Sequence, residues 1–153
     1  MNAATDALSV LIDKVSSERD DAQLELQRAQ GALAAARQQL EQLGAYGRDY
    51  AQRYAGARSS SVELLRCYHG FMDRLDQAQA MQRRACEQAE LRVERTRAEL
   101  LALELRVASV KKLIERRDAD HARAAERREQ KLTDEQASRA AWQRLAAGGA
   151  LAA

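Results

Sequence analysis

Side chains that could carry out catalysis or bind a metal are few in this 153-residue chain. The two histidines, His69 and His121, are far apart in the sequence, and neither has cysteine or carboxylate neighbours at the spacing of a metal site. No glycine-rich loop that could cradle a phosphate is present. No serine or cysteine has a base and an orienting acid in a suitable pattern. We therefore expect a protein that is not an enzyme and that uses no cofactor.

The two cysteines, Cys67 and Cys86, also argue against redox chemistry. On a single helix they would lie about 28 Å apart, at ~1.5 Å rise per residue. That distance is too long for a disulfide bond. Free cysteines are typical of proteins in a reducing compartment, and we expect both to be small core residues.

The amino-acid composition indicates that the chain consists of long helices. The chain has no proline, although average usage of about 5% would give about seven or eight. Alanine accounts for 32 residues, charged residues for 31% and aromatic residues for 4%. This balance is typical of long helices and coiled coils, and it excludes a β-rich fold. The net charge of +2, with both signs interleaved, does not indicate a nucleic-acid binder, and no apolar run approaches the ~18 residues of a membrane span.

A first heptad seam, with apolar residues at alternating steps of three and four, occupies the N-terminal third of the chain. Only Arg19 and Gly47 interrupt it. The series predicts one long helix with a single apolar stripe; its members are Leu8, Ile12, Val15, Arg19, Ala22, Leu26, Ala29, Leu33, Ala36, Leu40, Leu43, Gly47, Tyr50, Tyr54 and Ala57.

A glycine- and serine-rich segment, residues 56–61, follows this seam. Ser60 and Glu63 have the spacing of a capping box, in which a hydroxyl and a carboxylate cap the first turn of a helix. We expect a helix over about 4–57, a turn over about 58–61 and a second helix over about 61–146. These elements form one hairpin over residues 1–146, and the glycine-containing residues 147–153 form a flexible tail.

The second helix has its own seam, which ends where the first helix has no residues left to face it. An antiparallel hairpin would place Leu43 opposite Leu75 and Leu8 opposite Val110. The sequence thus predicts an all-α, antiparallel two-helix coiled-coil hairpin whose longer second helix overhangs the first. A parallel homodimeric coiled coil is the alternative, and the glycine- and serine-rich break favours the hairpin. The second seam comprises Val62, Leu65, Tyr68, Met72, Leu75, Gln79, Gln82, Cys86, Ala89, Val93, Thr96, Leu100, Leu103, Val107, Val110 and Ile114.

An aromatic and polar stripe near the turn is the first candidate for recognition. Tyr46 and Phe71 lie outside the seams, at the same level of the hairpin. Exposed aromatic residues in a chain with so few of them indicate a binding surface. The alternative is that they flank and thicken the core. The predicted patch comprises Gln39, Leu43, Tyr46, Tyr50, Phe71, Leu75, Ala78 and Gln82.

The overhang of the second helix is the second candidate. Residues 111–131 contain eight Lys and Arg against five acidic residues, and a lone helix of this kind is marginally stable in water. Two interpretations are open: a solvated helix end, or a charged prong that inserts into a protein partner. Trp142 and Leu145 could then act as an apolar anchor.

Four segments, taken in order, resemble the FliJ family of flagellar type III protein export components. They are residues 11–22, residues 39–50 with the pattern Q-L-x-x-L-x-x-Y-x-x-x-Y, residues 68–78 with Y-x-x-F-x-x-x-L-x-x-A, and residues 126–139, which begin ERREQKLTDE. Their order and spacing over about 130 residues are more specific than any one of them alone.

The resemblance implies a hairpin similar to the central stalk subunit of rotary ATPases. It implies a cytoplasmic protein, peripherally associated with the inner membrane at the flagellar base. Its partners would be the hexameric export ATPase, whose assembly and activity it promotes, the cytoplasmic domain of the export gate protein, and export chaperones, which it helps to recycle. Neither nucleic acid nor direct membrane insertion is expected.

The resemblance also assigns residues to each surface. The patch near the turn, from Gln39 to Gln82, would contact the export gate. Two other functions stay open: a purely structural coiled-coil scaffold, and a stalk protein of a related non-flagellar type III secretion system. The ATPase would contact the overhang through Arg116, Arg117, Arg123, Arg127, Arg128, Lys131, Asp134, Glu135 and Arg139.

Overall fold

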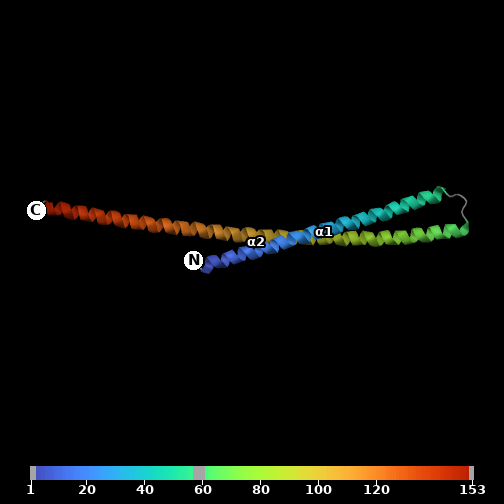
Figure 1. Cartoon of the computed structure of the whole chain (residues 1–153), viewed down its shortest axis with the longest axis horizontal. Coiled ribbons are helices and arrows are strands. Elements are labelled where there is room, and N and C mark those ends of the chain that lie inside the picture. Colours follow the sequence, from blue (N-terminus) through green and yellow to red (C-terminus); the bar gives the residue numbers. More distant parts are fainter. Residues whose placement is uncertain (1–2, 57–60, 152–153) are drawn as a thin grey trace. The chain divides into compact units, whose positions relative to one another are not determined.

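The computed structural model describes residues 3–56 and 61–151, which form two helices (Figure 1). Helix α1 spans Ala3–Gly56 and has 54 residues, and helix α2 spans Val62–Leu151 and has 90 residues. No strand occurs in the described ranges. The two helices pack against each other, which confirms the predicted all-α hairpin with a longer second helix.

The chain divides into two compact units. Residues 13–107 form the central unit, and residues 1–12 together with 108–153 form the terminal unit. In the central unit α1 and α2 run antiparallel, because late residues of α1 contact early residues of α2. The Gln82 side-chain amide donates to the Ala36 carbonyl at 2.9 Å, and Arg92 lies 3.7 Å from the Glu25 carboxylate.

Small side chains form the core of the central unit, as expected where two helices approach closely. Thr96 is a buried polar member, and its hydroxyl donates to the Arg92 carbonyl at 2.6 Å, so its hydrogen-bonding group is satisfied. The buried apolar residues of this unit are Val15, Ala29, Leu75, Cys86, Val93 and Val107.

The two predicted seams are confirmed along nearly their whole length. Each seam position that the structure describes is buried or half-buried except three. Tyr50 is 40% exposed, as is Leu65, and Val62 is 71% exposed. Val62 and Leu65 lie in the first turn of α2. Residues 57–60, which precede this turn, are outside the described part of the chain.

In the terminal unit, the first residues of α1 lie against the segment of α2 that follows Val107. Val110 is buried, and Leu8, Ile12 and Ile114 are half-buried. The Arg117 guanidinium donates to the Ala4 carbonyl at 3.1 Å, close to the first residue of α1. Beyond this contact, side chains from residue 118 to residue 149 are exposed apart from two half-buried alanines.

The ends of α2 differ in detail from the expected boundaries. The Ser61 hydroxyl accepts a hydrogen bond from the Leu64 amide at 3.3 Å, so Ser61 caps the helix. Ser60, Ala57 and the expected turn residues 58–60 lie outside the described residues. At the other end α2 continues to Leu151, beyond the expected boundary at 146; the flexibility of the tail stays a prediction.

One of the two cysteines is not a core residue. Cys86 is buried in the central unit, as predicted, whereas Cys67 is exposed. The prediction for Cys67 was wrong because the adjacent residue, Tyr68, takes the inward position, and neighbouring helix residues point in directions about 100° apart.

Candidate functional site

Four aromatic rings from both helices form a cluster in the central unit: Tyr50, Tyr54, Tyr68 and Phe71. The rings of Tyr54 and Tyr68 stack with centroids 3.9 Å apart and planes 12° apart. Tyr50 stacks on Tyr68 at 5.9 Å and lies 4.3 Å from Phe71. Such pairs stabilise beyond their buried area by about 0.5–1.5 kcal/mol each, so this aromatic cluster ties the end of α1 to the start of α2.

Gly47 and Leu75 form the packed layer below the aromatic cluster. A Cβ atom on Gly47 would lie 3.1 Å from Leu75 Cδ2, so the glycine allows Leu75 to approach the α1 backbone. Leu75 is only 8% exposed as a result. The antiparallel pairing predicted Leu43 opposite Leu75, and Gly47 lies one helical turn further along α1.

Gln82, two helical turns after Leu75 on α2, connects the two helices through hydrogen bonds. Its side-chain amide donates to the Gln39 side-chain oxygen at 3.1 Å as well as to the Ala36 carbonyl. These contacts orient two polar residues of the predicted patch. Gln39 stays exposed, whereas Gln82 is half-buried.

Tyr46 is the most exposed aromatic residue of the predicted patch, at 66%. It lies in a shallow depression with Gln42, Ala45 and Asp49 on α1. Among the described residues, its ring contacts no other aromatic ring, whereas Phe71 contacts Tyr50. The structure therefore separates the predicted patch into exposed members and packed ones: Gln39 and Tyr46 are exposed, Tyr50 is 40% exposed, Leu43, Phe71, Ala78 and Gln82 are half-buried, and Leu75 is buried.

A groove of about 200 Å³ beside the aromatic cluster was not expected from the sequence. Sequence reasoning placed Tyr54 and Tyr68 in the seams and overlooked Arg53 and Leu64. Two tyrosines at facing seam positions were the available signal, since their rings are too large for a narrow two-helix core. The groove is lined by Tyr50, Arg53, Tyr54, Leu64, Cys67 and Tyr68.

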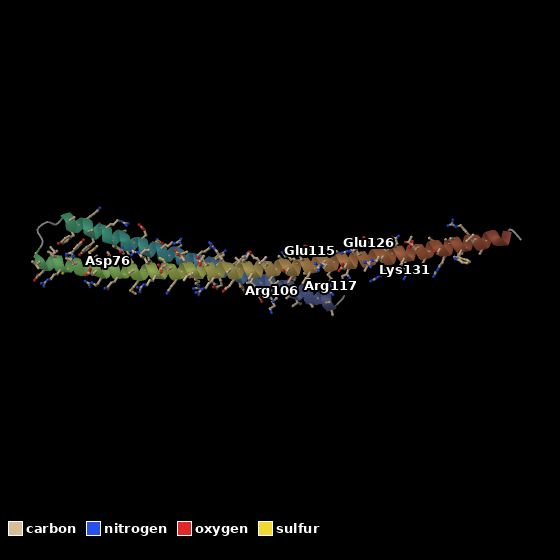
Figure 2. The ribbon with its side chains drawn as sticks, turned by 180° about the vertical axis from the view of Figure 1, so that it is seen from behind. Asp76, Arg106, Glu115, Arg117, Glu126 and Lys131 are labelled. Carbon is tan, nitrogen blue, oxygen red and sulfur yellow. The ribbon has the colours of Figure 1, made fainter. Side chains whose placement is uncertain are left out.

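The second predicted surface lies in the terminal unit, on α2. In Figure 2 the side chains of Glu126 and Lys131 project outward from the α2 ribbon. Arg117 differs from the other predicted residues, because it is half-buried and bonded to Ala4. Arg123 pairs with Asp120 at 3.2 Å. The other predicted members are exposed: Arg116, Arg127, Arg128, Lys131, Asp134, Glu135 and Arg139.

Several exposed cations of this surface form no ion pair within the described residues. Arg127, Arg128 and Lys131, which are close together in the sequence, are among them. Their charges are fully solvated and available to an acidic partner surface. They lie in a segment, residues 111–131, with a charge excess of three.

Neither surface offers a site for a metal ion. Within residues 3–56 and 61–151, no three His, Cys, Asp or Glu side chains gather in a way that could hold one. In the same ranges neither helix has a stretch that is both long and apolar enough to cross a bilayer. What the two surfaces present to solvent is aromatic, polar and charged side chains.

Comparison with known proteins gives one match. The family model described as "Flagellar FliJ protein" matches residues 5–146, which is most of the chain. No curated protein matches significantly. No solved structure does so either.

Proposed function

The chain belongs to the FliJ family and is therefore a coiled-coil protein related to flagellar export. On this basis, we propose that it binds the hexameric export ATPase and promotes the assembly and activity of that enzyme. The exposed segment of α2 from Arg116 to Arg139 is the proposed contact. The observation that carries this proposal is a set of exposed cations that form no ion pair within the described residues, among them Arg127, Arg128 and Lys131, in the part of α2 that does not pack against α1.

A lone charged helix is suited to entering a ring. Its exposed side chains need no further packing against α1, and its excess of positive charge would favour acidic loops at the ring entrance. Such steering acts mainly on the association rate and weakens with salt. The acidic members, Asp134 and Glu135, would pair with basic residues deeper in the ring.

The test is hydrolysis by the purified ATPase with increasing amounts of this chain. We expect the double variant Arg127→Glu with Arg128→Glu to need about tenfold more protein for half-maximal stimulation, because two attractive charges become repulsive. Helicity by circular dichroism should stay the same, since both side chains are exposed.

The matched control is a second exposed arginine pair on α2, Arg83 and Arg84, in the central unit. The variant Arg83→Glu with Arg84→Glu has the same change in net charge and should stimulate like the wild type. An equal loss of ATPase stimulation in both variants would mean that the effect comes from the net charge of the chain and not from the segment near Arg127. Full stimulation by the first variant would exclude this segment as the contact.

The patch near the aromatic cluster is the proposed contact for the cytoplasmic domain of the export gate protein. The exposure of Tyr46 supports this role, since aromatic side chains dominate the energy of many interfaces. The packed members, Leu75 and Phe71, would hold Tyr46 and its neighbours in place without much direct contact.

Binding of the gate domain to Tyr46→Ala tests this division. We expect at least a tenfold loss of affinity, typical of a hot-spot residue, and almost no change in melting temperature. Trp142→Ala, which removes an aromatic residue that is 74% exposed in the terminal unit, should bind the gate domain normally. A large drop in the melting temperature of Tyr46→Ala would instead mean that Tyr46 stabilises the fold by packing and is not primarily a binding residue.

Recycling of export chaperones and peripheral association with the inner membrane complete the proposal. Both would follow from docking to the ATPase and the gate. Pulldown of chaperones with and without the ATPase would show whether they need a surface of this chain.

A further inference from the structure

Helix α2 carries an exposed apolar stripe in the central unit, formed by Leu91, Ala98, Leu101 and Leu105 and called here the outer stripe. The three leucines are 50%, 58% and 61% exposed, and Ala98 is exposed as well. The proposed contacts with the ATPase and the gate use none of these residues.

The outer stripe repeats like a coiled-coil seam. Its steps of seven, three and four residues are heptad steps, and it lies two residues before the buried series that includes Val93 and Val107. A shift of two residues turns about 200° around a helix. The outer stripe therefore faces away from α1, and a second helix could pack on it.

Single exposed leucines are common, but several at heptad spacing on one face are typical of an interface. Flanking charges indicate which kind of helix would fit. Arg97 and Glu104 are both exposed, one heptad apart, and neither forms an ion pair with any described residue.

We propose that a second copy of this chain packs on the outer stripe, with the two α2 helices antiparallel. When Ala98 of one copy lies opposite Leu101 of the other, Arg97 of each copy faces Glu104 of its partner. Two-fold symmetry forms this ion pair twice. The flanking charges of the surface are thus complementary to each other across the two-fold axis.

The antiparallel direction follows from Glu94, which interrupts the outer stripe between Leu91 and Ala98. In a parallel dimer in register, the two Glu94 carboxylates would meet at the interface and repel each other. A parallel pair would also leave Arg97 beside Ala102, without a partner charge. The antiparallel arrangement separates the Glu94 residues and pairs Arg97.

Sedimentation velocity of the full chain over a wide concentration range, under reducing conditions because of the exposed Cys67, tests the dimer. We expect a monomer–dimer equilibrium whose dissociation constant rises at least about tenfold in Leu101→Glu, because symmetry buries the new charge twice. Leu24→Glu, which changes a leucine that is 51% exposed on α1, is the matched control and should dimerise normally. A wild type that is monomeric throughout, or a Leu101→Glu variant with unchanged association, would overturn the proposal.

Charge exchange tests the direction of the helices. Arg97→Glu should weaken the dimer, and the addition of Glu104→Arg in the same chain should restore it, since the ion pair forms again with reversed sign. A double variant as weak as Arg97→Glu would exclude the antiparallel arrangement. Circular dichroism of each variant controls for helicity.

Discussion

At the scale of single residues, Gly47 shows how an apparent defect in a pattern serves packing. In the sequence it interrupts the first seam, and glycine in a helix costs about 1 kcal/mol relative to alanine. In the structure it allows Leu75 to approach α1 and become buried. The burial of Leu75 offsets that cost.

Leucine substitution at two glycines of α1 tests this role. Gly47→Leu should lower the free energy of unfolding by about 1–3 kcal/mol, because the new side chain overlaps Leu75. Gly31→Leu, where a Cβ atom would meet nothing within 4 Å, should raise it by up to about 0.8 kcal/mol through better helix propensity. Chemical denaturation followed by circular dichroism measures both. Equal stability of the two variants would mean that Leu75 moves aside at no cost.

At the scale of elements, α2 is supported unevenly along its length. Its central part has a buried seam, whereas the part after Asp118 is a solvated helix stabilised by its own hydrogen bonds and by pairs such as Asp120–Arg123. Exposed ion pairs contribute only about 0–1 kcal/mol each. Arg117 lies at the transition and holds the first turn of α1 through Ala4.

Removal of the Arg117 guanidinium should loosen the start of α1. In Arg117→Ala the Ala4 carbonyl loses its side-chain donor, and we expect faster hydrogen exchange of amides in residues 4–12. The change in global stability should stay within about 1 kcal/mol. Arg116→Ala, an exposed neighbour on the same helix, is the control and should leave exchange unchanged. Faster exchange in both variants would point to a general loss of charge.

At the scale of the whole molecule, the proposed contacts lie on separate surfaces. The aromatic cluster with Tyr46 and the outer stripe belong to the central unit, and the cationic segment belongs to the terminal unit. Tyr46, the outer stripe and the cations near Arg127 are exposed side chains, so each of these can be changed without disturbing the seam. This separation makes single-surface variants informative.

Hydrogen exchange along α2 should reveal the same division. Amides of residues 86–107 should exchange at least about tenfold more slowly than those of residues 119–149, since only the first range packs against another helix. The comparison needs one measurement on the full chain. Addition of the ATPase should slow exchange in residues 119–139; no change there would argue against the proposed contact.

The sequence alone determined the helices and their buried faces. Heptad spacing decides which face of a helix is apolar, and burial of that face follows from the hydrophobic effect whatever the details of the contact. The two seams, the start of α2 near Ser61 and the overhang of α2 were therefore predictable. The motifs also placed the chain in its family.

Only the tertiary structure decided which side chains of the predicted patch are exposed. Periodicity predicts the direction in which each side chain points from its helix. It does not predict the register between α1 and α2 or the orientations of the aromatic rings between them, because both depend on packing across the two helices. Leu75 approaches Gly47 closely, one helical turn from the predicted partner Leu43, and the ring of Phe71 contacts that of Tyr50. Arg117 likewise is half-buried rather than exposed, because its guanidinium donates to the Ala4 carbonyl of α1. These contacts join residues distant in sequence, so local pattern could not specify them.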